Sequence, residues 1–273
     1  MPELPEVETV KESLKLRLNN KKIIRTKVLW DNIIAYPNKD EFIKEIANQT
    51  ISDVKRRGKF LMFDLDDYFL LSHLRMEGKY QICKKGDILS KHDHVIFVLD
   101  EGMELRYNDV RKFGRMKLIP KEKINDMPPF TELGLEPWDK NLTVDYLKEH
   151  LKNKKIPIKT ALLDQSIITG IGNIYDDEIL FLSHINPLTP ANQVSSNKLK
   201  LIIENTIITL DKAISEGGTT IRNYTSEEGV TGLFQNHLYV HTKAGKACPN
   251  CGTTILKIKV NGRGTYYCPK CQK

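Results

Sequence analysis

The chain has 273 residues, more than the about 100–200 residues of one typical domain, which predicts two domains. With 40% hydrophobic and 28% charged residues, its composition is that of a globular protein rather than a disordered one. No run approaches the ~18 apolar residues of a membrane span, and the acidic start MPELPEVETV lacks the features of a signal peptide. We therefore expect a cytoplasmic protein without a membrane partner.

The net charge of +7 is concentrated at one end of the chain. Residues 229–273 contain seven Lys and Arg residues and no Asp or Glu, so the whole excess lies there. A basic terminal module suggests a polyanionic partner, most simply nucleic acid. On charge alone, a solubilising tail is the alternative.

The first predicted element is a helix over residues 4–18. One apolar face repeats at spacings of three and four, through Leu4, Val7, Val10, Leu14 and Leu18. Pro2 and Pro5 suit the start of such a helix.

Short β-rich runs follow from about residue 22 to residue 120. They are RTKVLW (25–30), KFLMFDL (59–65), YFLLSHL (68–74), HVIFVLD (94–100), MELRYND (103–109) and RMKLIP (115–120). Regularly spaced short strands separated by glycine and charged turns indicate an antiparallel sandwich or barrel. Cys83, in another strand-like run, is most simply a small core residue.

Residues 126–139 contain three prolines and are predicted to be a linker. Beyond them the apolar spacing becomes helical, in residues 144–155, 158–165, 173–185 and 197–214. The second half of the chain is therefore predicted to be helical up to a small cysteine-containing unit at its end.

Four cysteines predict a metal site in this last unit. Cys248 and Cys251 form one C-x2-C pair, and Cys268 and Cys271 form another after sixteen residues. Four thiolates close a tetrahedral Zn²⁺ site and leave no open position, so the zinc would be structural. Disulfides, a redox motif or an iron–sulfur site are the alternatives. Residues 255–267 alternate like a two-stranded ribbon, which favours zinc.

The N-terminus offers a possible nucleophile. Removal of Met1 would make Pro2 the first residue, a secondary amine that forms an iminium directly on attacking an electrophilic carbon. Glu3 adjoins it and could shuttle protons, with Glu6 one turn further on. The alternative is a proline-capped helix whose acidic residues favour its N-terminus.

Eight strings in register resemble the formamidopyrimidine-DNA glycosylase family. They are MPELPEVETV, KRRGKF (55–60), HLRMEGKY (73–80), DVRKFG (109–114), ALLDQ (161–165), GIGNIYDDE (170–178), GGTTIRNY (217–224) and CPNC with GRGTYYCPKCQ. The match runs from residue 2 to residue 272 in the family's order.

The resemblance implies an α+β protein in three parts. An N-terminal helix with an antiparallel β-sandwich would form a catalytic domain over residues 1–135. A helical helix-two-turn-helix domain would follow over residues 136–236, and a C-terminal β-ribbon zinc finger over residues 237–273. DNA would bind between the first two domains.

The implied activity is base-excision repair by a monomer. The enzyme would remove oxidised purines, namely 8-oxoguanine and formamidopyrimidines, from double-stranded DNA and cleave the abasic strand by β,δ-elimination. Pro2 would attack C1′ and form a Schiff base, with Glu3 as general acid and base. Because the reaction occurs at C1′, the nucleotide must first leave the duplex.

The resemblance also assigns DNA-binding residues. Lys59 and Arg263 would complete the catalytic machinery at the phosphate beside the lesion, with Asn173, His73 and Lys155 as further phosphate contacts. Met76, Arg111 and Phe113 would fill the void left by the flipped nucleotide. Glu77, Thr219, Arg222 and Tyr224 would line the damaged-base pocket.

Each of these assignments has a simpler alternative from the sequence alone. Lys59 could be a solvated turn lysine, Arg263 a charge on the ribbon surface, and Asn173 a helix N-cap. Met76 and Phe113 could be core residues.

The sequence departs from the family in two places. Residues 240–248 stand where many members have a Tyr-Gly-Arg run, and Asp176 stands where many have a small or apolar residue. Two other functions compete with the one implied: the endonuclease VIII branch, which prefers oxidised pyrimidines, and a non-enzymatic DNA-binding protein. Leu4 favours the purine branch, and Pro2, Glu3 and Lys59 together favour an enzyme.

Overall fold

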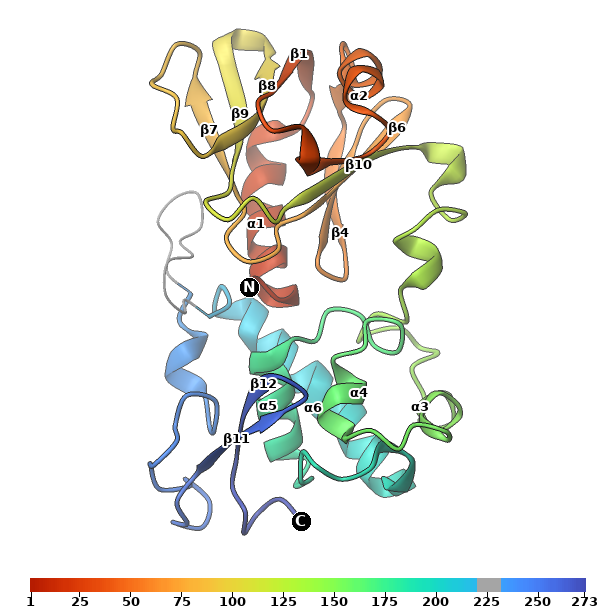
Figure 1. Ribbon diagram of the computed structural model, residues 1–273, viewed down its shortest axis with the longest axis vertical. Coiled ribbons are helices and arrows are strands. Elements are labelled where there is room, and N and C mark those ends of the chain that lie inside the picture. Colours follow the sequence, from red (N-terminus) through yellow and green to blue (C-terminus); the bar gives the residue numbers. More distant parts are fainter. Residues whose placement is uncertain (220–231) are drawn as a thin grey trace. The chain divides into compact units, whose positions relative to one another are not determined.

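The computed structural model describes residues 1–219 and 232–273, which form two compact units. Met1–Thr131 belong to unit 1, and Glu132–Thr219 with Leu233–Lys273 belong to unit 2. Each unit is described by itself (Figure 1). None of the helices in the described ranges is both long enough and apolar enough to cross a bilayer.

Unit 1 contains the predicted N-terminal helix and β-sandwich. Helix α1 spans Leu4–Leu18, as the apolar spacing predicted. One sheet has the order β3-β1-β8-β9-β7, with bounds Thr50–Ile51, Lys21–Val28, Asp93–Leu99, Met103–Asn108 and Lys79–Lys84. The other has the order β2-β10-β6-β5-β4, with bounds Ile34–Tyr36, Arg115–Pro120, Tyr68–His73, Phe60–Asp64 and Asp53–Arg57. All pairings are antiparallel except that of β10 with β2.

The core of unit 1 lies between α1 and the two sheets. Val7 and Leu14 of α1 share one buried cluster with Phe63 of β5 and Phe97 of β8. Strand β8 is buried along its whole length, as expected for a strand covered on both faces. The apolar face of residues 4–18 is thus the surface on which the sandwich packs.

The sequence did not predict helix α2, Lys39–Ile46, which lies between β2 and β3. Asn38 caps it by accepting a hydrogen bond from the Glu41 backbone N–H at 3.0 Å. Phe42 and Ile46 are buried. Their spacing of four was a usable signal, although the helix is short.

Unit 2 begins at Glu132, within the predicted linker of residues 126–139, whose one regular element is a short 3₁₀ helix at Phe130–Glu132. The predicted helices follow as α3 (Val144–Leu151), α4 (Ile158–Leu162), α5 (Asn173–Leu182) and α6 (Ser196–Ser215). Helix α6 packs against α3 and α5, and α4 packs against α5.

The predicted ribbon is also present in unit 2. Strands β11 (Leu256–Val260) and β12 (Arg263–Tyr267) form an antiparallel hairpin around a two-residue Asn-Gly turn. Asn261 and Gly262 have φ values of 43° and 81°, the left-handed conformation that a tight hairpin turn of this kind requires. Strand β12 contacts α5, so the ribbon shares a core with the helical part of the unit.

Candidate active site and nucleic-acid interface

The start of α1 holds the predicted nucleophile and its neighbouring acid. Glu3 is the N-cap residue and Glu6 the third helical residue, and together they form a capping box in which the Glu3 N–H donates to Glu6 Oε2 at 2.8 Å. Pro2 is buried, and Glu3 is 3% exposed, whereas Met1 is 43% exposed. The capping alternative therefore describes the local geometry correctly. That geometry also holds the Glu3 carboxyl group beside residue 2.

Lys59 directly precedes strand β5, which pairs with the strand of His73, β6. Lys59 follows Gly58 in the turn between β4 and β5 and is only 7% exposed, so the alternative of a solvated turn lysine is wrong. Phe60 pairs with His73 in the sheet, and their rings meet edge to face at 4.7 Å.

His73 is held in one neutral form. Its burial, reinforced by the positive charges of Arg75 and Lys59, lowers the pKa of His73 to about 3. The Arg75 backbone N–H donates to His73 Nδ1 at 3.0 Å, which leaves Nε2 as the N–H donor. A buried ammonium and a neutral imidazole donor thus lie close together.

The predicted void-filling side chains lie on two exposed loops. Met76, on loop 74–78 between β6 and β7, is 37% exposed. Phe113, on loop 109–114 between β9 and β10, is 47% exposed, so both residues lie outside the core and the core alternative is wrong. The Arg111 guanidinium lies 4.6 Å from the centroid of the Phe113 ring, which keeps these two side chains together.

In unit 2 the structure brings Asn173 and the strand of Arg263 together. Asn173 is the first residue of α5, and Gly172 is the N-cap, so the capping alternative for Asn173 is wrong. The Asn173 Nδ2 donates to the Gly264 carbonyl at 3.0 Å. Arg263 is exposed and begins β12 next to this bond. The simpler alternative for Arg263, a charge on the ribbon surface, agrees with this exposed position.

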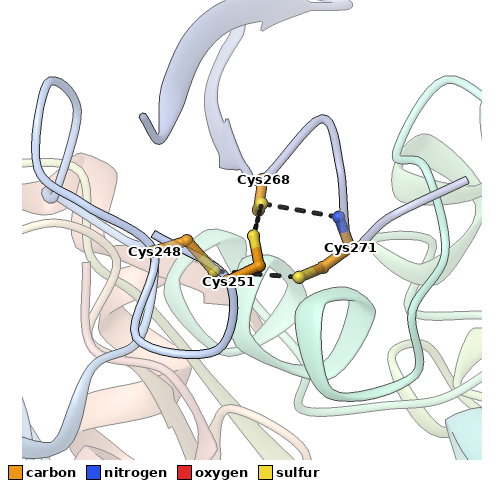
Figure 2. Close-up of side chains that lie close together, drawn as sticks. All are labelled: Cys248, Cys251, Cys268 and Cys271. Atoms are coloured by element: carbon orange, nitrogen blue, oxygen red, sulfur yellow. Dashed lines mark hydrogen bonds between the residues drawn. The ribbon is translucent and has the colours of Figure 1, made fainter. Parts of the chain in front are cut away.

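The four cysteines converge in the way a zinc site requires (Figure 2). All four sulfur atoms lie within 4.8 Å of one another, with Cys248 Sγ 3.8 Å from Cys271 Sγ and Cys251 Sγ 3.5 Å from Cys268 Sγ. A tetrahedral site with Zn–S bonds of about 2.3 Å has edges of about 3.8 Å, so the residues fit the ion. Hydrogen bonds from Thr253 lower the pKa of Cys251 to about 6, whereas burial raises the pKa of Cys268 and Cys271, so Cys251 is the most readily ionised of these three thiols.

Polar contacts hold the segment before the ribbon against α5. The Glu178 carboxylate accepts backbone N–H bonds from Tyr239, Val240 and His241 at 2.7, 3.0 and 2.8 Å. At the other end of the unit, Gln272 donates to the Ile185 carbonyl at 2.9 Å. Helix α5 and the segment that follows it therefore hold both ends of the zinc finger.

Asp176, which seemed an unexplained departure from the family, belongs to a buried ionic cluster. Lys159 Nζ lies 2.6 Å from Asp177 Oδ1 and 3.5 Å from Asp176 Oδ2, and all three side chains are at most 1% exposed. Burial alone would lower the pKa of Lys159, but the two carboxylates raise it. His241 belongs to residues 240–248, the other segment that departs from the family, and its Nδ1 lies 2.6 Å from Asp177 Oδ2. The two departures from the family thus belong to one cluster, and its members are too far apart along the chain for a sequence pattern to predict it.

The remaining predicted residues are less closely grouped. Lys155 is exposed in the turn between α3 and α4. Glu77 is half-buried on loop 74–78, and Thr219 is buried and pairs with Leu233 in an isolated antiparallel bridge. Arg222 and Tyr224 lie outside the described residues.

Three family models match the chain in order. The formamidopyrimidine-DNA glycosylase N-terminal domain matches residues 1–116, and the H2TH domain of the same glycosylase matches residues 133–225. The zinc finger found in FPG and IleRS matches residues 245–273. These matches follow the order of parts that the sequence predicted.

Whole-chain relatives agree with these models. The chain is 50% identical to the formamidopyrimidine-DNA glycosylase of Oceanobacillus iheyensis, over 100% of this chain and 98% of the relative, and 46% identical to that of Bacillus subtilis, over 100% and 99%. The Lactococcus lactis Fpg, in a complex with DNA containing an abasic site, has a TM-score of 0.93 with 39% identity over the whole of both chains. A mutant of it in complex with Fapy-dG-containing DNA has a TM-score of 0.93 with 40% identity, again over both whole chains. The chain belongs to the formamidopyrimidine-DNA glycosylase family.

Proposed function

We propose that this protein is a bifunctional DNA glycosylase that removes 8-oxoguanine and formamidopyrimidines from double-stranded DNA and then cleaves the abasic strand. The observation that carries the proposal is the start of α1, where a chain of this family has a proline at position 2 beside the buried carboxyl group of Glu3. Because the substrate would be DNA, we expect the protein to act at the chromosome, in the cytoplasm of a bacterial-type cell. The protein would act as a monomer.

The reaction would begin once Met1 has been removed. The Pro2 nitrogen attacks C1′ and the bond from C1′ to the damaged base breaks; the N–H proton that Pro2 loses is passed through Glu3 to the leaving base. Glu3 then protonates O4′ as the sugar ring opens, which leaves an iminium between Pro2 and C1′. Loss of a C2′ proton expels the 3′ phosphate, and a second elimination expels the 5′ phosphate.

Each unit carries donors that would bind phosphates around the lesion. In unit 1, the Lys59 amine and the His73 Nε2–H would donate hydrogen bonds to phosphate oxygens. His73 would do so as a neutral imidazole, because its pKa is lowered to about 3. In unit 2, Arg263 and Asn173 lie at the joint of β12 and α5, and the exposed Lys155 would add a further cationic contact. These donors would bind the sugar–phosphate backbone of the DNA rather than the base edges.

The exposed loops of unit 1 would support the extruded state of the DNA. Met76 and Phe113 would fill the void, and Arg111 would hydrogen-bond the orphaned base. Glu77 and Thr219 would contact the flipped base, together with Arg222 and Tyr224. Zn²⁺ bound by the four cysteines would supply structure only, because four thiolates leave no position for substrate.

A lesion panel tests the proposed function. The protein would be incubated with duplexes containing 8-oxoguanine opposite cytosine, a formamidopyrimidine, thymine glycol, or undamaged guanine. We expect excision and strand cleavage on both purine lesions. The thymine glycol duplex is informative because the Lactococcus lactis Fpg has also been obtained in complex with an oxidised pyrimidine-containing DNA, at 39% identity and a TM-score of 0.91.

Two outcomes would contradict the proposal. Faster excision of thymine glycol than of either purine lesion would place the chain with the pyrimidine-specific branch. Tight binding to lesion duplexes with no excision from any of them would favour a non-enzymatic DNA-binding protein.

A further inference from the structure

The loops that carry Met76 and Phe113 each connect a strand of one sheet to a strand of the other, and they lie next to each other. Loop 74–78 leads into β7 and loop 109–114 follows β9, and Lys79 of β7 lies opposite Asn108 of β9. At their other ends the loops reach the second sheet, where β6 and β10 pair. Both loops therefore lie at one end of the sandwich.

Tyr107 of β9 lies beneath both loops. Its side chain is fully buried. A methyl group added to Gly78 would come within 2.8 Å of Tyr107 Cζ, and one added to Gly114 within 2.6 Å, with the hydroxyl oxygen closer still in both cases. Ordinary contact begins at 3.4 Å, so only glycine allows either loop to close on this phenol. One side chain thus sets the position of two loops whose glycines are 36 residues apart in the sequence.

The backbone of loop 109–114 is fixed around Asp109. This carboxylate is fully buried and accepts backbone N–H bonds from Arg111 at 3.0 Å, Phe113 at 2.9 Å and Gly114 at 2.8 Å. The Asp109 carbonyl accepts a hydrogen bond from His94 Nε2 at 2.8 Å. The loop is therefore preorganised from within, and its contact with Tyr107 decides where it lies relative to loop 74–78.

An outer contact braces the same loop. Lys112 has a φ of 58°, and its ammonium lies 4.1 Å from the centroid of the Trp30 ring. Lys112 thus contacts Trp30, while Arg111 contacts the Phe113 ring. The two void-filling side chains of this loop are thus presented together.

We infer that Tyr107 is a positioning residue that fixes the Met76 loop and the Phe113 loop as one rigid unit. The inference rests on the proposed function, because it concerns the residues proposed to fill the void in the DNA. Side chains that enter a base stack from two loops must keep a fixed separation, and a misplacement of about 1 Å can lower a rate about 10²-fold. Tyr107 maintains that separation without contacting DNA.

Hydrogen exchange tests the coupling without reference to activity. Tyr107→Phe removes the oxygen against which both glycines pack, and Tyr80→Phe is the matched control. Tyr80 is 2% exposed and pairs with Tyr107 in the sheet, and its ring lies 5.2 Å away. We expect Tyr107→Phe to accelerate amide exchange in loops 74–78 and 109–114 together, and Tyr80→Phe to leave both loops as in the wild type.

Excision kinetics test the consequence for the reaction. On an 8-oxoguanine duplex, Tyr107→Phe should lower kcat/KM on the order of tenfold, with a thermal unfolding midpoint close to that of Tyr80→Phe. In a Met76→Ala/Phe113→Ala background, the same substitution should cause no further loss, because the side chains it positions are gone. Gly114→Ala, which overfills the same contact, should lower kcat/KM in the same direction.

The outcomes separate this inference from the proposed function. Unchanged exchange in either loop, or a loss of kcat/KM that persists in the Met76→Ala/Phe113→Ala background, would overturn the role of Tyr107. A wild-type protein that excises no lesion would refute the proposed function, while the exchange experiment would still decide whether Tyr107 couples the loops.

Discussion

The start of α1 and the zinc ribbon position their functional side chains by different means. Pro2 and Glu3 are buried at the end of a helix whose apolar face packs into a core shared with two sheets. The ribbon has only a small apolar cluster, formed by Phe181, Val240 and Ile255 with Cys248 and Cys268. Its functional residue, Arg263, is exposed.

This difference follows from what each region is proposed to do. A nucleophile and a proton-transferring acid work best where water is excluded, and a large core provides such a place. A phosphate-binding cation must remain exposed, so the structure that holds it must be rigid without a large apolar core around it. In the ribbon, a metal site and buried polar contacts replace the missing apolar core.

Removal of the zinc should have the largest effect, and it should be confined to unit 2. Structural zinc binding contributes about 10–16 kcal/mol in small zinc modules, so Cys268→Ser should lose the metal and the ordered ribbon. DNA affinity should fall with it, since Arg263 loses its support. Zinc content and duplex binding are the measurements, with Cys83→Ser, a thiol outside the cluster, as the control. A metal-free protein that binds DNA normally would contradict this view of the ribbon.

Glu3→Gln should affect the other region and leave the ribbon intact. Loss of a general acid lowers rates by about 10²–10⁴-fold, and the amide oxygen can still accept the capping hydrogen bond. We expect base excision to fall by this factor with normal zinc content. Strand cleavage at a preformed abasic site should fall much less, because no base must leave and the abasic sugar opens to its aldehyde without the enzyme. Equal losses in the two assays would show that Glu3 acts mainly through the helix start.

Lys159→Met tests the buried ionic support of the ribbon. Removing one partner of a buried ion pair costs about 3–5 kcal/mol, because Asp176 and Asp177 would remain buried without their cation. Denaturant unfolding of the whole chain should show this loss in unit 2. Lys154→Met is the matched control: Lys154 and its partner Asp164 are both 35% exposed, and such pairs contribute about 0–1 kcal/mol. A similar small effect for both variants would refute the importance of the buried cluster.

The smallest expected effect is on the pH dependence of stability in unit 1. Because the folded pKa of His73 is lowered from 6.5 to about 3, the unfolded chain takes up a proton that the folded one does not as the pH falls below about 6.5. The free energy of unfolding should therefore decrease by up to about 1.4 kcal/mol per pH unit from this group. His73→Gln should flatten the profile between pH 6.5 and 5. An unchanged slope in that variant would show that His73 is not held neutral by the fold.

Patterns local in the sequence predicted much of this fold. The spacing of Leu4 to Leu18 gave the first helix, and the two C-x2-C pairs gave the zinc ligands, because each depends on residues that are close along the chain. Phe113 follows Arg111 and Lys112 and precedes Gly114, and such a charged loop favours the exposed side chain that the structure shows. These features need no knowledge of distant contacts.

Features that depend on distant contacts were not predictable in this way. Tyr107 looked like any apolar strand residue, since nothing in the sequence links Gly78 to Gly114. Asp176 looked like an added surface charge, because its partner Lys159 lies on another helix. The buried state of Lys59 likewise depends on the packing around a hairpin turn, which its charge alone would place in solvent.

The central claim is that the amine of Pro2 is the nucleophile, and borohydride trapping tests it most directly. Protein from which Met1 has been removed would be incubated with an 8-oxoguanine duplex and borohydride, which reduces the iminium between protein and C1′ to a stable covalent bond. The adduct would be mapped by peptide mass spectrometry. A preparation that retains Met1 would be treated in the same way. We predict a covalent adduct on Pro2 in the first preparation and a loss of trapping by more than about 10³-fold in the second. An adduct on a lysine, or full trapping with Met1 retained, would contradict the claim.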